Sequence, residues 1–256
     1  MEQKNVLKKA VLPLDYETYV FDLYGTLVDI RTWEGDEKLW DKLSLFMGYY
    51  DAHYKPKELS KAYFQLVKGK EKALKSELEK DAKYAHEASP EIEITEVFEE
   101  LYRKKGIEVS KELAIHTGQF FRVLSTEYVK VYRGTEEMLR FLKEQGKKVY
   151  LLSNAQRIFT EYEMHVLGIA KYFDGILISS DYKTKKPDKR FFDALIEKYA
   201  INPETTLFIG NDSRTDIGGA KEVDFATYYV KSNISPQGDM AMEADYIVKN
   251  FKAWHV

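Results

Sequence analysis

From Gly134 onward, short runs of consecutive apolar residues alternate with longer segments in which apolar residues recur every three or four positions. The first pattern is typical of strands buried on both faces, and the second of amphipathic helices. The apolar runs are KVYLLS, GILIS, TLFIG, ATYYV and DYIV, separated by helical segments at about 135–145, 157–167, 188–199 and 216–223. This alternation predicts a doubly wound parallel α/β sheet covered by helices on both faces.

The stretch VFDLYGTL, residues 20–27, predicts another buried strand of this sheet, because its apolar start leads into a Tyr-Gly-Thr turn. The next hundred residues differ, since they contain several helical stripes and no recognisable strand pattern. We therefore predict a Rossmann-like core made of residues 1–28 and 131–256, with an all-helical cap inserted at 29–130.

Four helical patterns account for most of this insertion. The apolar stripes include Leu39, Leu43 and Met47; Leu59, Tyr63 and Leu66; Val97, Phe98 and Leu101; and Phe120, Phe121 and Leu124. Ser89 and Pro90 are predicted as the N-cap and first position of the third helix, and Gly106 as its end. Ser110 is predicted to open the fourth helix.

The composition excludes several classes of function. The chain has 256 residues, and its charged residues leave a formal net charge of only -3, which argues against nucleic acid or an anionic membrane as a partner. There is no cysteine, so thiol catalysis and thiolate metal sites are excluded. We find no signal-peptide core and no apolar run of about 18 residues, and we expect a cytoplasmic protein acting on a small molecule.

Chemically useful residues gather where the predicted strands end. In a doubly wound sheet, ligands bind beyond the carboxyl ends of the strands. The residues found there are Asp22, Tyr24 and Thr26; Ser153 and Asn154; Lys186; and Asn211, Asp212, Ser213 and Asp216. Each of them taken alone would be interpreted as a turn former, a helix cap or a loop residue. Their arrival at successive strand ends predicts a single polar crevice.

This set of side chains is suited to phosphoryl transfer. Asp22 can attack phosphorus and form an acyl phosphate, which divides one difficult step into two easier ones. Thr26, Ser153 and Asn154 can donate hydrogen bonds to the phosphoryl oxygens, and Lys186 supplies a fixed positive charge.

The charges of the same set also predict a metal ion. Asp22, Asp212 and Asp216 against the single cation Lys186 leave the crevice about two charges negative, which would repel a phosphate dianion. A hard divalent cation has to intervene, and Mg²⁺ held by carboxylate oxygens is the natural choice. No other cofactor is expected.

The sequences FDLYGTL, LLSN, KKPDKRFF and IGNDSRTDIGGAK, in this order, resemble the four motifs of the haloacid dehalogenase superfamily, a group of hydrolases composed mostly of phosphatases. The helical insertion resembles the cap of that family. The resemblance implies that Asp22 is the nucleophile, that Thr26 and Ser153 bind the transferred group, and that Lys186 steadies its charge.

The resemblance further implies a metal site and a supporting carboxylate. Asp22, Asp212 and the backbone carbonyl of Tyr24 would bind Mg²⁺. Asp216 would orient Lys186 or a metal-bound water.

Tyr24 departs from the pattern of the family's phosphatases, which have an aspartate there as general acid and base. A phenol has a pKa of about 10, so it is a poor proton donor and acceptor near neutral pH. A halide ion leaves without needing a proton. The metal-independent L-2-haloacid dehalogenase branch of the family forms an aspartyl ester, and the stretch DLYGT of this chain resembles that branch. A dehalogenase is therefore the alternative function.

The other motifs disagree with the dehalogenase branch. That branch has serine and asparagine where this chain has Asp212 and Ser213, and tyrosine where it has Phe192. NDSRTDIGGAK instead resembles the phosphoglycolate-phosphatase type of fourth motif. We favour a Mg²⁺-dependent phosphatase of a small phosphorylated metabolite and keep a catalytically silent phospho-ligand binding protein as a third hypothesis. The long insertion argues against a signalling receiver.

Overall fold

The computed structural model of the chain describes residues 5–84, 88–241 and 243–256; residues 1–4 of the predicted first core segment lie outside this part. Its centre is a seven-stranded parallel sheet in the order β1-β10-β9-β8-β3-β6-β7. The strands are β1 Asn5–Leu7, β3 Thr18–Phe21, β6 Lys148–Ser153, β7 Gly175–Ile178, β8 Thr206–Gly210, β9 Ala226–Val230 and β10 Tyr246–Val248. The predicted α/β sheet is confirmed.

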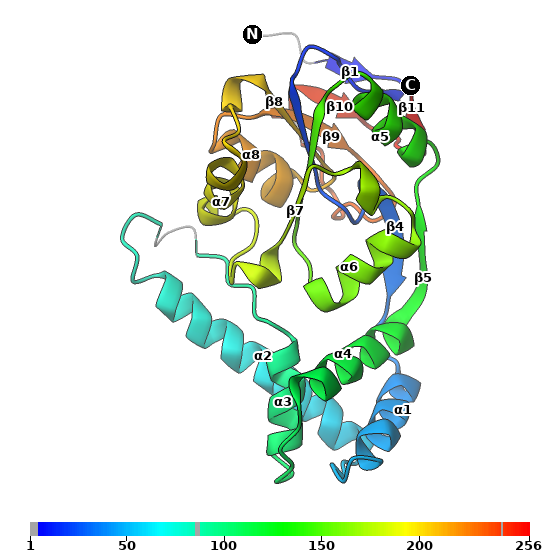
Figure 1. Cartoon of the computed structure of the whole chain (residues 1–256), viewed down its shortest axis with the longest axis vertical. Helices are drawn as coiled ribbons and strands as arrows, with labels where there is room; N and C mark the ends of the chain where they lie inside the picture. Colours follow the sequence, from blue (N-terminus) through cyan, green and yellow to red (C-terminus); the bar gives the residue numbers. More distant parts are fainter. Residues whose placement is uncertain (1–4, 85–87, 242) are drawn as a thin grey trace.

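Helices cover both faces of the sheet, as Figure 1 shows. They are α5 Thr135–Glu144, α6 Arg157–Val166, α7 Lys189–Tyr199 and α8 Gly219–Lys221, the last preceded by a wide helical turn at Ser213–Gly218. Alternate residues of β3 point to opposite faces: Tyr19 and Phe21 pack with α5 and α6, whereas Val20 packs with α7. A short parallel pair joins β2 Ala10–Val11 to β11 Trp254–His255, close to the C-terminus.

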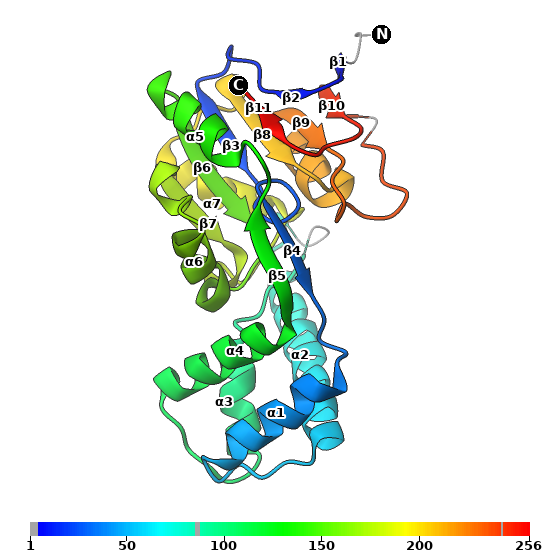
Figure 2. The ribbon, with the colours of Figure 1, turned by 90° about the vertical axis from the view of Figure 1, so that its right-hand side faces the viewer.

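Four helices form a separate unit with its own apolar core, below the sheet in Figure 2. They are α1 Glu37–Gly48, α2 Pro56–Leu78, α3 Thr95–Arg103 and α4 Lys111–Ser125. The ring centroid of Phe121 in α4 lies 5.7 Å from that of Trp40 in α1, 5.0 Å from that of Tyr63 in α2 and 5.7 Å from that of Phe98 in α3. One aromatic cluster therefore joins all four helices. In the described part of the chain, no helix is both long and apolar enough to cross a membrane.

The prediction that residues 29–130 contain no strand is wrong. Strands β4 Val28–Thr32 and β5 Thr126–Val131 form an antiparallel ribbon that joins the helical unit to the sheet, and Figure 2 shows it between them. The predicted boundaries at 28/29 and 130/131 lie inside this ribbon. Its residues alternate between polar and apolar without an uninterrupted apolar run, because a ribbon outside the core is only partly buried.

The predicted start of the third helix is also wrong, because α3 begins at Thr95. Ser89 does not cap it; instead its backbone N–H donates to Asp188 Oδ2 at 3.1 Å, and Pro90 pairs with Thr184 of the core. The predicted cap of the fourth helix is confirmed, since the Ser110 hydroxyl accepts a hydrogen bond from the Leu113 backbone N–H at 3.3 Å.

Candidate active site

Three charged side chains meet at the carboxyl edge of the sheet. Strands β3 and β8 are neighbours, and the Asp22 backbone N–H donates to the Ile209 carbonyl at 2.9 Å, which places the start of the first motif beside the fourth. The Lys186 ammonium lies 2.7 Å from Asp22 Oδ1 and 2.7 Å from Asp216 Oδ1. All three side chains are buried, so the ammonium links two carboxylates in a place that water hardly reaches.

Asp216 also holds the backbone of the fourth motif. Its Oδ2 accepts hydrogen bonds from the backbone N–H groups of Asn211 and Asp212, each at 3.0 Å. Burial raises the pKa of the Asp216 carboxyl to about 7, and the Lys186 ammonium opposes that rise. Burial alone would lower the pKa of Lys186, but the carboxylates of Asp216 and Asp22 outweigh it and raise that pKa.

The turn after the nucleophile strand packs tightly against the fourth motif. The Thr26 hydroxyl lies 3.5 Å from Asp22 Oδ2 and 3.4 Å from Asn211 Oδ1. Gly25 has a φ of +92°, and a Cβ atom there would lie 2.3 Å from Asn211 Nδ2. Only glycine combines this backbone conformation with so close an approach.

Ser153, the last residue of β6, and Asn154, which follows it, serve in different ways. Asn154 accepts a hydrogen bond from the Lys186 backbone N–H at 2.8 Å and donates one to the Lys186 carbonyl at 3.0 Å, so its amide positions the lysine. Ser153 is fully buried, and its hydroxyl has no hydrogen-bond partner within the described residues. An unpaired buried hydroxyl is unfavourable by about 1–3 kcal/mol, so this atom is free to meet a ligand.

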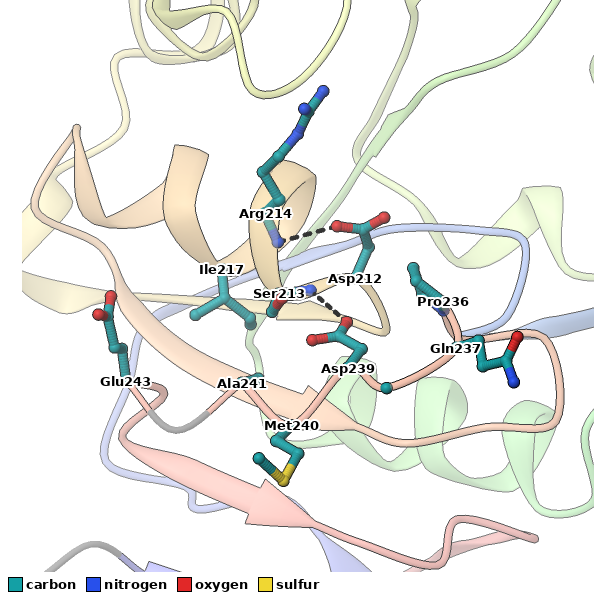
Figure 3. A pocket seen from close by; sticks show the side chains of 11 residues that line it. Asp212, Ser213, Arg214, Ile217, Pro236, Gln237, Asp239, Met240, Ala241 and Glu243 are labelled. Carbon is teal, nitrogen blue, oxygen red and sulfur yellow. Dashed lines mark hydrogen bonds between the residues drawn. The ribbon is translucent and has the colours of Figure 1, made fainter.

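Asp212 begins the helical turn of the fourth motif. Its Oδ1 accepts backbone N–H groups of Arg214 and Thr215 at 2.9 and 2.8 Å. Figure 3 shows Asp212 and Asp239 around a hollow of about 700 Å³, with Asp239 accepting the Ser213 N–H. The residues lining this hollow do not include the three charged residues that meet at the sheet edge, so the hollow is distinct from their meeting point.

The hydroxyl of Tyr24 is engaged away from Asp22. It donates to Glu163 Oε2 at 2.5 Å and lies 3.0 Å from the Thr160 hydroxyl, both residues of α6. Arg122, from α4 of the helical unit, donates to both oxygens of Glu163 at 2.7 and 3.2 Å. Burial raises the pKa of Tyr24 above its usual value, and the Glu163 carboxylate raises it further. The phenol is therefore a weaker acid than in water.

The partners of Tyr24 could not be predicted from the sequence. Thr160 and Glu163 are three positions apart, so they share one face of α6, but nothing in the local sequence relates them to Tyr24 or to Arg122. Their contact depends on how the helical unit sits on the sheet. The group made of Tyr24, Thr160, Glu163 and Arg122, which we call the interdomain cluster, thus joins three distant segments.

We expect the ion pair of the interdomain cluster to stabilise the protein measurably. The side chains of Arg122 and Glu163 are only 19% and 11% exposed. A double-mutant cycle with Arg122→Met and Glu163→Gln, followed by urea unfolding, should give a coupling free energy of about 1–3 kcal/mol.

The pair Arg31 and Glu127 on the ribbon is a matched control, since its side chains are 67% and 60% exposed at a separation of 3.1 Å. Exposed pairs contribute about 0.2–1 kcal/mol. Equal coupling in the two cycles would show that the interdomain cluster does not hold the helical unit to the core.

Known proteins resemble this chain in sequence and in fold. The sequence model of the haloacid dehalogenase-like hydrolases matches residues 16–224. A probable phosphoglycolate phosphatase of Pseudomonas putida is 31% identical over 97 residues, which are 38% of this chain and 38% of that protein. A glyceraldehyde 3-phosphate phosphatase of Methanothermobacter thermautotrophicus is 26% identical over 122 residues, 48% of this chain and 52% of that protein. The chain thus spans about half, or less, of the length of these relatives.

Solved structures extend the likeness to nearly the whole chain. The 2-haloacid dehalogenase of Pseudomonas syringae pv. Tomato DC3000 has a TM-score of 0.57 at 17% identity, with 92% of this chain and 94% of that one covered. An HAD phosphatase of Thermococcus onnurineus has a TM-score of 0.54 at 18% identity, covering 91% and 94%. At such identities the likeness shows a common fold.

Proposed function

Because the chain belongs to the haloacid dehalogenase-like hydrolases, we propose that it is a Mg²⁺-dependent phosphatase that acts on a small phosphorylated metabolite through an aspartyl phosphate at Asp22. The observation that carries the proposal is the excess of carboxylate at the sheet edge. Asp22 and Asp216 share one ammonium, Asp212 is joined to Asp216 through its backbone, and no arginine side chain among the described residues forms an ion pair with any of the three. The two phosphatase-named relatives support the same choice.

The residues at the edge fit a magnesium ion. Asp22 Oδ2 has only a 3.5 Å contact with Thr26, and the backbone bonds of Asp212 use its Oδ1 alone. One or two carboxylates plus further oxygens are what Mg²⁺ accepts, and the Tyr24 carbonyl would complete the protein's share. Among the described residues no three acidic or histidine side chains are grouped so that they could hold a metal ion, and the proposed set therefore relies on two acidic side chains and a backbone oxygen. Bound Mg²⁺ would offset the negative charge of the crevice and polarise the phosphoryl group.

The side chains of the chain itself have separate tasks. Asp22 attacks phosphorus as the bond from phosphorus to the leaving oxygen breaks, and water then attacks the phosphorus of the acyl phosphate, which releases phosphate and restores the carboxylate. Lys186 holds Asp22 and stabilises the charge that develops on the phosphoryl oxygens. The free hydroxyl of Ser153 donates to one of these oxygens. Asn154 and Asp216 position Lys186.

Proton transfer to the leaving group is the weak step. The Tyr24 hydroxyl already donates to Glu163 and its pKa is raised, so it is a poor general acid. Substrates whose leaving group needs little protonation, such as acyl phosphates and activated esters, should therefore react fastest.

A paired assay separates the phosphatase from the dehalogenase. We expect release of phosphate from phosphomonoesters with Mg²⁺ and none with EDTA, and no release of chloride from 2-chloropropionate under either condition. The dehalogenase mechanism needs no metal. Chloride release that EDTA does not affect would therefore show that the protein is a dehalogenase and not a phosphatase. Absence of turnover in every arm would favour a silent binding protein.

Substituting Tyr24 tests the weak proton transfer. With Tyr24→Asp, we expect turnover of glycerol phosphate to rise about tenfold, because the new carboxyl group can supply part of the rate enhancement of a general acid. Turnover of p-nitrophenyl phosphate should change by less than about twofold, because nitrophenolate leaves without a proton.

Tyr24→Phe is the matched control, since it removes the hydroxyl and keeps the ring. We expect both rates to stay within about threefold of the wild type, because the hydroxyl serves Glu163 and not the substrate. A large loss of glycerol phosphate turnover in Tyr24→Phe would show instead that the phenol is the proton donor.

A further inference from the structure

A hollow of about 540 Å³ lies between the ribbon and the last two loops of the core. Its walls are formed by the end of β5 with the two residues after it (130–133), by the segment after β9 (231–233) and by the segment after β10 (249–252). Five cationic side chains and one carboxylate line it: Lys130, Arg133, Lys231, Lys249, Lys252 and Asp29. We call it the basic hollow.

The charge of the basic hollow is opposite to that of the whole chain, which has a net charge of -3. Lys130 lies 3.4 Å from Asp29. The other four cations have no carboxylate partner within the described residues, although carboxylates outnumber cations in the chain as a whole. Cations crowded without partners repel one another, and an anion that enters between them relieves this repulsion.

The walls of the basic hollow are held by hydrogen bonds. The Phe251 backbone N–H donates to the Lys231 carbonyl at 3.1 Å, and the Trp254 N–H donates to the Arg133 carbonyl at 2.8 Å. Asn233 donates to Asp29 at 2.9 Å and accepts from the Tyr132 hydroxyl. The segments that carry the cations are therefore fixed relative to one another, which lowers the entropy lost when a ligand binds.

The basic hollow lies at the edge of the sheet where ligands bind in this class of fold. Lys231 follows the last residue of β9, and Lys249 follows the last residue of β10, just as Asp22 follows β3. Its walls also touch the nucleophile turn: the Tyr132 N–H donates to the Leu27 carbonyl at 2.9 Å, and the Trp254 indole donates to the Thr26 carbonyl at 3.0 Å.

We propose that the basic hollow binds a compact polyanion of the diphosphate class, separately from the catalytic crevice. Four unpaired cations match the three to four charges of a diphosphate better than the two of a monophosphate. The hollow is bounded by the ribbon on one side and by two loops on the other, so its cations surround one place and do not form the continuous stripe that a nucleic acid backbone needs. The inference does not depend on which reaction Asp22 performs.

Calorimetric titration with pyrophosphate and with ADP, both in EDTA at low ionic strength, tests the proposal. EDTA matters because the crevice without metal is negative and repels these anions. The variant Lys249→Gln/Lys252→Gln removes two exposed cations of the basic hollow. The variant Lys42→Gln/Lys104→Gln removes two exposed cations of the helical unit and the same charge.

We expect the wild type to bind pyrophosphate. The variant Lys249→Gln/Lys252→Gln should raise the Kd about tenfold, because it loses two partly solvated ion pairs with the ligand. The variant Lys42→Gln/Lys104→Gln should change the Kd by less than about twofold. Similar binding of ADP would identify the diphosphate group as the part that is recognised, and binding of pyrophosphate alone would identify the free anion. Equal affinity of the wild type and the Lys249→Gln/Lys252→Gln variant would overturn the proposal, as would a wild-type Kd above about 1 mM. Tight binding of an oligonucleotide without binding of pyrophosphate would also overturn it.

Discussion

The variant Asp22→Asn is expected to lose at least about a thousandfold in kcat for phosphate release while remaining folded. An amide is not a nucleophile, and removal of a nucleophile from an assembled site costs several orders of magnitude because the remaining groups cannot replace it. Asparagine has nearly the shape of aspartate and keeps an oxygen to accept the Lys186 hydrogen bond, which spans 2.7 Å in the wild type. Steady-state kinetics with Mg²⁺, together with thermal unfolding, provide the measurement.

Asp29→Asn serves as the control for this prediction, because Asp29 is equally buried but lies on the ribbon. Its turnover should remain close to that of the wild type. Residual activity of Asp22→Asn within about tenfold of the wild type would exclude Asp22 as the nucleophile, since loss of a nucleophile has much larger effects. Trapping a phosphorylated wild-type protein by acid quench, and failing to trap one with Asp22→Asn, would locate the intermediate directly.

The variant Lys186→Met should produce the largest loss of stability of any substitution at the sheet edge. Lys186 is 2% exposed and lies between Asp22 and Asp216, so an apolar side chain of similar length would leave two buried carboxylates without a cation. Removing one partner of a buried ion pair costs about 3–5 kcal/mol in the free energy of unfolding. Urea unfolding in EDTA measures this, and phosphatase activity should disappear in the same variant.

A second substitution shows whether unbalanced charge causes the loss. In Lys186→Met/Asp216→Asn one of the two stranded carboxylates is gone, and we expect about 1 kcal/mol or more of the lost stability to return. A double variant as unstable as Lys186→Met alone would mean that packing, and not charge, requires the lysine. A loss below about 1 kcal/mol in Lys186→Met would contradict the buried pairing itself.

The fold of the core could be predicted because its strands are buried on both faces. A strand such as TLFIG carries apolar residues on both faces when helices cover both sides, so the pattern is visible in a single sequence. The four helices of the inserted unit were visible for the related reason that each has one buried stripe. The ribbon of β4 and β5 was missed because only part of each strand is buried, which leaves no apolar run to recognise.

The sequence by itself also determined which residues meet at the sheet edge. Parallel strands end at the same edge, which predicts that Asp22, Lys186 and Asp216 lie on one side of the sheet, and the structure places Lys186 within hydrogen-bond distance of both carboxylates. The position of Lys186 between them also depends on the loop that follows β7, which no strand pattern describes. Only the tertiary structure decided the partners of Tyr24. Glu163 and Arg122 come from helices of two different units, and no spacing along the chain encodes their contact.

The same distinction applies to the basic hollow. Its lysines and arginine are scattered over more than a hundred residues, where each is an ordinary surface cation. Local patterns record how a segment is buried, because periodicity follows directly from the geometry of a helix or a strand. Where charges from separate segments come together depends on how those segments pack, and that is settled only when the whole chain has folded.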